Sequence, residues 1–363
     1  MLIISTYTIS IILVYCISKY QYSLKIKKEG LSSSQKLSWV SIALFTLFFV
    51  GINYIYTYST ELSMTGDRLN YKSGYYSNIS PSAGLLLLNF IGKYYNCEFN
   101  DFALLITLFS VPLVFIAYKY AKGATPLMLL FLLLTPYFIN GFDNFKQTFT
   151  NGFSCLFFAL TTYKPSTKND ILCILIILSG CMFHPTGFIL IIFYAIYRLN
   201  IKVNNIPILF LTILLCTILM PEIMMLIAKV TGSAIPFLSE KILQYFEEDS
   251  EMGEGKLMIA LKGSVYFYIT AMMIINRRIL KNNITNFSFY IIICCFVCML
   301  FLLSYYNVWM PRMAELFFFP VMLCWAKSLK FIPNKGLNIF ISCILTGFFT
   351  YRLMWMTYVT PIS

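Results

Sequence analysis

Residues 38–58 read SWVSIALFTLFFVGINYIYTY, a run that contains no charged side chain. A helix of this length rises about 30 Å, which matches the hydrocarbon core of a bilayer. Within hydrocarbon the backbone N–H and C=O groups must find partners inside the segment, and an α-helix provides them. The run therefore predicts a transmembrane helix.

Similar apolar runs recur along the whole chain, separated by short polar gaps. Hydrophobic residues make up 59% of the chain and charged residues 12%, too little polar surface for a soluble protein. We therefore expect an all-α, polytopic integral membrane bundle that forms one transmembrane domain over residues 1–363. The twelve expected spans are residues 2–18, 38–58, 102–118, 126–142, 148–163, 170–183, 186–198, 206–227, 258–275, 287–306, 313–326 and 337–356. The sixth and seventh are short, and the break at His184–Pro185 indicates either a tight helix pair or one broken helix.

The positive charges fall mostly in every second gap. Of the 27 Lys and Arg residues, 17 lie in the gaps at 19–37, 119–125, 164–169, 198–205, 276–286 and 327–336. The positive-inside rule makes these gaps cytoplasmic and both chain termini external. The cations form no large basic domain, so the net charge of +12 does not indicate a nucleic-acid partner.

The cysteines and the two long external loops carry weaker signals. Most of the 11 cysteines lie inside apolar spans, where they serve as small packing residues. Loop 59–101 contains an apolar run at 83–91 that is too short to span and is expected to lie in the membrane interface. Loop 228–257 carries an acidic stretch, which is either a solvated loop or a lid over an external cavity.

Polar and ionisable residues gather at the external ends of the expected helices. Such residues at membrane depth are costly, and by default they mark a functional site. Because four separate helix junctions present them at one depth, we expect a cavity that opens to the outside. The candidates are Asp67, Arg68, Tyr71, Tyr75, Asn144, Lys146, Gln147, His184, Arg312 and Glu315.

Each candidate has a chemical and a structural interpretation. His184, the single histidine, is the obvious proton donor or acceptor, or else it caps a helix end beside Pro185. Arg312 is suited to clamping a phosphate, or else it pairs with Glu315 three residues later. Lys146 at an external helix end is placed either to bind an anion or to reach lipid headgroups.

Four of the candidates belong to loop 59–101, whereas Asn144 and Gln147 flank Lys146. Asp67 could accept a proton or a sugar hydroxyl, or else it forms a turn with Arg68. Tyr71 and Tyr75 could stack on sugar faces, although many tyrosines in such a chain belong to the interfacial aromatic belt.

At these residues the chain resembles the EpsG type of Wzy polysaccharide polymerase, which joins O-antigen or exopolysaccharide repeat units. The resemblance extends over most of the chain, in order and in topology. Its individual motifs are an Asp followed by tyrosines, an Asn-x-Arg-Gln segment, a His before a small turn, and a late Arg. They match Asp67, Tyr71 and Tyr75; Asn144-Phe145-Lys146-Gln147, with lysine replacing arginine; His184-Pro185-Thr186; and Arg312.

The resemblance implies a GT-C-like bundle in the bacterial cytoplasmic (inner) membrane, with both termini periplasmic. The implied substrates are repeat units linked to undecaprenyl diphosphate, and the growing chain is transferred to a sugar hydroxyl of the incoming unit. Arg312 and Lys146, with Arg68, would stabilise the leaving diphosphate, and His184 or Asp67 would be the base. A flippase and a chain-length regulator are the implied partners.

We expect no cofactor and a metal-independent reaction, because the cations supply the charge and no carboxylate pair has metal-ligand spacing. Loss of activity in chelator, restored by magnesium, would count against this expectation. Two other functions stay open. A flippase or other transporter should show related halves and midplane polar residues, and the chain shows neither. An acyltransferase would need a cytoplasmic donor site, and no His or Arg lies inside a span on that side.

Overall fold

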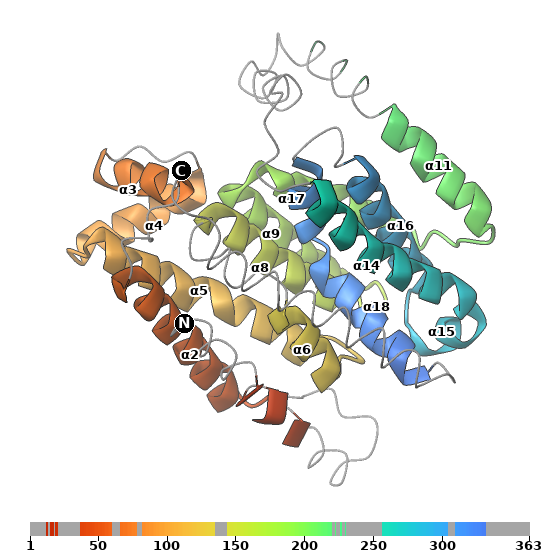
Figure 1. The fold of residues 1–363 in the computed structure, drawn as a ribbon, viewed down its shortest axis with the longest axis horizontal. Helices are drawn as coiled ribbons and strands as arrows, with labels where there is room; N and C mark the ends of the chain where they lie inside the picture. The colour runs from red at the N-terminus through yellow and green to blue at the C-terminus, as the bar shows by residue number, and fades with distance from the viewer. Residues whose placement is uncertain are drawn as a thin grey trace.

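The computed structural model describes residues 37–59, 66–77, 82–134, 144–219, 256–303 and 309–331, with scattered positions in 12–20 and 222–229. Every regular element in this part of the chain is a helix (Figure 1). The helices are α2 (Trp39–Ser59), α3 (Gly66–Ser77), α4 (Ala83–Tyr94), α5 (Phe99–Tyr120), α6 (Pro126–Leu134), α8 (Phe145–Leu160), α9 (Thr167–Phe183), the 3-10 helix η2 (Pro185–Phe188), α10 (Ile189–Arg198), α11 (Ile206–Ile218), α14 (Lys256–Ile275), α15 (Arg277–Asn283), α16 (Phe287–Leu303), α17 (Trp309–Glu315) and α18 (Phe318–Phe331).

The expected all-helical architecture is confirmed for these residues, and each expected span within them falls on a helix. Two helices, α2 and α5, are long and apolar enough to cross a membrane by length and composition. Several others are apolar but shorter, among them α4, α16 and α18. The count of twelve spans stays a prediction, because spans 2–18 and 337–356 and loop 228–257 lie largely or wholly outside the described residues.

The break at His184–Pro185 separates two helices that form a tight antiparallel pair. Helix α9 ends at Phe183, η2 makes the turn, and α10 returns. The Arg198 Nε atom near the end of α10 lies 3.3 Å from the Asp170 carboxylate at the start of α9. The alternative of one broken helix is therefore wrong.

One expected span is divided, and one expected loop is helical. The span 313–326 breaks between α17 and α18 because Pro320 has no N–H to offer the Leu316 carbonyl four residues earlier. Ser154 Oγ of α8 donates to that carbonyl instead, at 2.5 Å. In loop 59–101, the polar stretch Gly66–Ser77 forms α3, a helix that no apolar run announces.

Helix ends are closed by short polar side chains. Ser82, Asn144 and Ser166 occupy the N-cap positions of α4, α8 and α9, and each side chain accepts a backbone N–H of the first turn. Asn96, Asn200 and Asn286 follow α4, α10 and α15 with positive φ, a conformation that asparagine tolerates.

Helix α8 lies at the centre of the bundle. It packs against α5 on one side and α9 on another, and α2 lies beyond α5 (Figure 1). Helix α18 joins α8 to a second group formed by α14, α16 and α17. A smaller aromatic core holds α3 and α4 on the ends of α5 and α8, and it includes Tyr75, Phe99, Phe102, Phe145 and Phe149.

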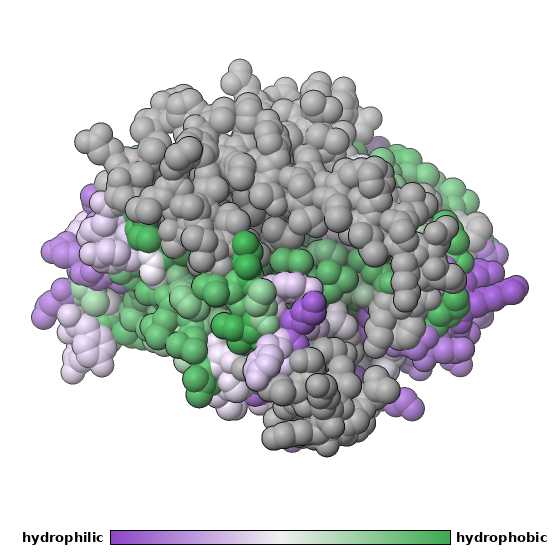
Figure 2. Space-filling view, turned by 60° about the horizontal axis from the view of Figure 1, so that its bottom comes forward, coloured by the Kyte–Doolittle hydropathy of each residue, from purple (hydrophilic) through white to green (hydrophobic). Residues whose placement is uncertain are grey.

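The outer surface is strongly apolar. Figure 2 shows hydrophobic side chains over much of the coloured part of this face, with a small hydrophilic group near its middle and further hydrophilic groups toward both ends. On α9 alone, Ile171, Ile174, Leu175, Leu178 and Met182 are exposed. A soluble monomer rarely exposes so continuous an apolar face.

Candidate functional site

The N-terminus of α8 gathers several of the predicted residues. Asn144 Oδ1 caps the helix by accepting the Gln147 N–H at 3.3 Å. The same oxygen accepts the Tyr71 hydroxyl of α3 at 3.2 Å. The Tyr71 ring stacks on the Phe145 ring, and the Lys146 Nζ atom lies 5.7 Å from the centre of the Tyr71 ring. Two motifs that are far apart in the sequence therefore meet here.

His184 lies in the turn between α9 and η2, and its hydrogen bonds define its tautomer. The Thr186 backbone N–H donates to His184 Nδ1 at 3.2 Å, and the Thr186 hydroxyl lies 2.8 Å from the same nitrogen. A backbone N–H can only donate, so Nδ1 is an acceptor and the neutral ring carries its proton on Nε2. The ring is largely buried, so both the capping and the chemical interpretation of His184 remain compatible with its place.

Antiparallel packing brings His184 to the level of Lys146. One turn into α8, Thr150 Oγ1 donates to the Gly180 carbonyl of α9 at 3.2 Å. Lys146 lies one turn before Thr150, and His184 lies one turn after Gly180. Both residues therefore project from the same end of the α8–α9 pair.

Phe183, which precedes His184, is held from two sides. Its ring stacks on Phe149 of α8 with centroids 4.3 Å apart. On the other side it fills the space beside Gly84 of α4, where an added Cβ would lie 2.8 Å from the ring. Helices α4 and α8 thus position the His184 turn.

Helix α17 carries Arg312 and Glu315 beside α8. The Ser154–Leu316 hydrogen bond joins the two elements directly after Glu315. Gln147, almost fully buried, lies on the same face of α8 as Ser154, two turns nearer the N-terminus. The Arg312 side chain lies outside the described residues, so the proposed pair with Glu315 stays a prediction.

Arg68 is buried in α3 rather than exposed to an open space. Its guanidinium donates to Thr57 Oγ1 at 2.9 Å, and Thr57 in turn donates to Asn53 at 3.1 Å. The Asn53 amide donates to Thr107 of α5 at 2.6 Å. This series of hydrogen bonds joins α3 to α2 and α5. Position 67 lies in the first turn of α3, but the Asp67 side chain is outside the described residues.

Tyr75 and Tyr76 are neighbours on α3 that differ in exposure. Tyr75 is buried against Phe102, its hydroxyl donates to the Cys97 carbonyl at 2.7 Å, and burial raises its pKa. Tyr76 is exposed, and its hydrogen bond to Glu98 raises its pKa. Both phenols are therefore neutral near pH 7, and Tyr75 is engaged in packing in this structure.

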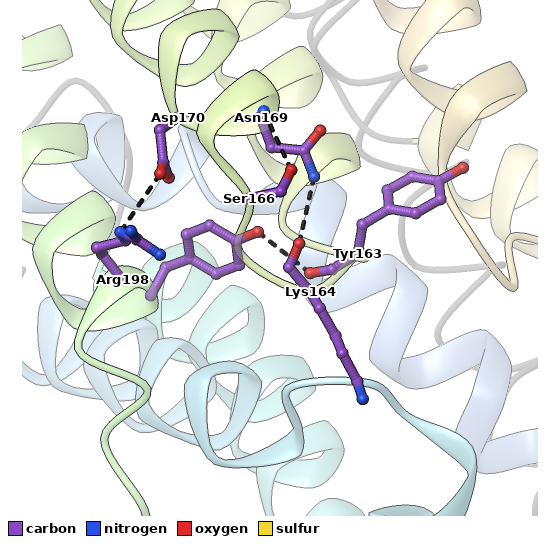
Figure 3. A network of polar contacts seen from close by, with 7 residues as sticks. Tyr163, Lys164, Ser166, Asn169, Asp170 and Arg198 are labelled. Carbon is purple, nitrogen blue, oxygen red and sulfur yellow. Dashed lines mark hydrogen bonds and ion pairs between the residues drawn. The ribbon is translucent and has the colours of Figure 1, made fainter.

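A separate polar cluster occupies the opposite ends of α8, α9 and α10 (Figure 3). Besides the Arg198–Asp170 ion pair, Tyr197 donates to the Tyr163 carbonyl at 3.2 Å, and Asn169 donates to the Lys164 carbonyl at 3.3 Å. These contacts fix the turns between helices. The cluster lies a full helix length from Asn144 and His184, so the polar groups sort to two ends of the bundle.

Sequence reasoning missed several buried amides and hydroxyls. Asn53 and Asn151 lie inside the expected spans 38–58 and 148–163, and both are almost fully buried. The sequence could have indicated them, because an amide inside an apolar run needs a hydrogen-bond partner. Asn53 has one in Thr107, whereas no residue in the described part of the chain donates to Asn151 Oδ1.

The groups assembled at this end of the bundle are of the kinds that bind anions and transfer protons in other proteins. The first turn of α8 offers backbone N–H groups and the positive end of its dipole, reinforced by Lys146. His184 contributes a ring tautomer that donates through Nε2. This arrangement fits a negatively charged substrate group better than a cationic one.

Comparison with protein-family models matches residues 36–362 to the EpsG family. No curated protein and no solved structure matches the chain.

Proposed function

The chain belongs to the EpsG family, which is associated with exopolysaccharide biosynthesis, and from this premise we propose that it is a repeat-unit polymerase. Its substrates are oligosaccharide repeat units linked to undecaprenyl diphosphate on the outer face of the bacterial cytoplasmic membrane. The growing chain passes from its lipid diphosphate to a hydroxyl of the incoming unit. The observation that carries the proposal is the meeting of α3, α8 and the His184 turn at one end of an apolar bundle.

A place in the membrane is supported by the surface of the helices. The apolar band of Figure 2 and the length of α2 and α5 suit a bilayer. Helix α4 is too short to span, yet Leu86, Leu87 and Phe90 are exposed on one side while Leu85 and Leu88 are buried on the other. That pattern suits a helix lying between the bundle and the lipid interface.

The reaction breaks the bond between the anomeric carbon and the diphosphate oxygen and forms a new bond to the acceptor oxygen. The electron pair leaves with the diphosphate, and cations that are already in place stabilise its developing charge. Lys146 and Arg312 fill this role. Arg68, buried and bonded to Thr57, acts by holding α3 against α2.

The acceptor hydroxyl loses its proton as the new bond forms, and Asp67 is the base. His184 is poorly suited to that role, because Nδ1 already accepts the Thr186 N–H and Nε2 carries the proton. His184 instead donates its Nε2–H to the leaving diphosphate. Position 67 lies one helical turn before Tyr71, which contacts the α8 cap.

The test is the polysaccharide ladder of a strain that lacks the gene. Deletion should leave acceptors that carry a single repeat unit, and the wild-type gene should restore the ladder. His184→Ala and Arg312→Ala, inserted at wild-type levels, should not restore it. If deletion removes even the single repeat, units are not reaching the outer face and a flippase is the better description.

A further inference from the structure

Asn151 is a buried amide of α8 whose carbonyl oxygen has no hydrogen-bond partner among the residues that the structure describes. Its side chain is 3% exposed, and Oδ1 is buried without a donor. Three residues later on the same helical face, Ser154 has a partner in the Leu316 carbonyl. The two residues differ in this respect although they share one face and comparable burial.

A buried carboxamide oxygen without a donor destabilises a folded protein. A leucine has the same branched shape and the same number of side-chain heavy atoms, and it carries no polar atom that needs a partner. Because no described residue supplies that donor, the asparagine is explained if a bound substrate supplies it. A locally unfavourable residue beside a candidate site is typical of function rather than of packing.

The position of Asn151 links it to the residues described above. Its neighbour Thr150 contacts Gly180, one turn from His184 on α9. Ser154 donates to the carbonyl of Leu316, the residue that directly follows α17. Leu316 is four residues, or one helical turn, after Arg312. Asn151 itself lies one helical turn after Gln147 on the same face of α8, about 10 Å along the helix axis from the Asn144 cap.

The chemistry of Oδ1 restricts the ligand. A carbonyl oxygen accepts hydrogen bonds, so it suits a hydroxyl group and disfavours the oxygens of a diphosphate, which also accept. We propose that Asn151 binds a sugar hydroxyl of the repeat unit and so contributes to the choice of sugar. This inference rests on the proposed function and adds a specificity-determining residue to it. A site that must pair a buried acceptor discriminates strongly against a sugar that lacks the hydroxyl.

The experiment compares Asn151→Leu with Ser154→Ala in the full-length protein. Purified in detergent, N151L should melt at or above the wild-type Tm, because the Asn151 oxygen has no partner among the described residues. S154A should melt below it, because the Leu316 carbonyl loses its donor. In the deletion strain, N151L should give at least tenfold less polymer than wild type at equal protein level. N151A, which removes the amide without adding volume, serves where N151L folds poorly.

Three outcomes overturn the inference. A Tm of N151L as low as that of S154A would mean that Asn151 has a partner within the protein. A normal ladder from N151L and N151A, in a strain where deletion stops growth at one repeat, would remove Asn151 from the site and leave the polymerase in place. A normal ladder from the deletion strain itself would remove the proposed function and this inference together.

Discussion

Tyr71 joins two helices through both its hydroxyl and its ring. The hydroxyl donates to the Asn144 oxygen that also caps α8, and the ring stacks on Phe145 beside the Lys146 ammonium. One side chain therefore fixes the cap, the first residue and the cation of α8. It makes the geometry of the proposed anion site depend on α3.

Tyr71→Phe and Tyr71→Leu separate these two contributions. The phenylalanine loses one hydrogen bond, about 1 kcal/mol of stability, and keeps the stack. The leucine also loses the aromatic contacts, a further ~1 kcal/mol. We expect Y71F to lower Tm slightly with a near-normal ladder, and Y71L to lower both. A Y71F protein with wild-type Tm and no ladder would show instead that the hydroxyl contacts the substrate.

His184→Gln and His184→Asn test which ring nitrogen acts. The glutamine amide can place an N–H near the position of Nε2, whereas the asparagine amide replaces only the Nδ1 side. If His184 donates through Nε2, H184Q should retain measurable polymer and H184N should fall to background. Proton transfer through the ring would leave both variants inactive, each about 10²–10⁴ below wild type. Ladder analysis with matched protein levels distinguishes these results.

At the scale of elements, the approach of α4 to α9 depends on a residue without a side chain. Gly84 leaves room for the Phe183 ring, and the residue after Phe183 is His184. Glycine is required here by close approach rather than by backbone conformation. Packing at this contact should therefore affect both stability and the candidate site.

Gly84→Ala should lower the free energy of unfolding by about 1–3 kcal/mol, because its Cβ would lie 2.8 Å from the Phe183 ring. Polymer length should fall with it as the His184 turn shifts. The matched control is Gly51→Ala in α2, where nothing lies within 4 Å of the new Cβ. That change should be neutral or stabilising, since alanine favours the helix. Equal melting temperatures for the two variants would contradict the α4–α9 packing.

Apolar runs in the sequence predicted the long helices well, but they did not predict the polar helix α3. α2, α5 and α9 correspond to expected spans because each is a run with few charges. Helix α3 was missed because its stability comes from Tyr75 and Arg68 packing onto other elements, not from its own pattern. To predict the break after α17, one would have to know both that Pro320 lacks an N–H and that Ser154 of α8 donates to the Leu316 carbonyl.

For the whole molecule, some loop cations also have structural roles. Lys119 is buried, donating to the Leu37 carbonyl at 2.6 Å with its ammonium 4.7 Å from the Trp39 ring centre. Lys327 likewise donates to the Asn283 carbonyl at 3.1 Å. Charge sorting predicts a cytoplasmic side for these residues, but it did not predict that they tie helix ends together. Those partners come from segments far away in the sequence.

The two polar ends of the bundle, one with Tyr71 and His184 and the other with Asp170 and Arg198, should lie on opposite sides of the membrane. The Tyr71 end should be outside. Ser77 at the end of α3 and Lys202 after α10 are exposed residues of the two ends. We therefore expect Ser77→Cys to react with a membrane-impermeant maleimide in intact cells. Lys202→Cys should react only after the cells are permeabilised. The unmodified chain, whose described cysteines are mostly buried, gives the background for both. The reverse labelling pattern would place the His184 end in the cytoplasm. The donors available there are nucleotide-linked sugars rather than translocated lipid-linked units. The proposed reaction would then be wrong together with the proposed topology.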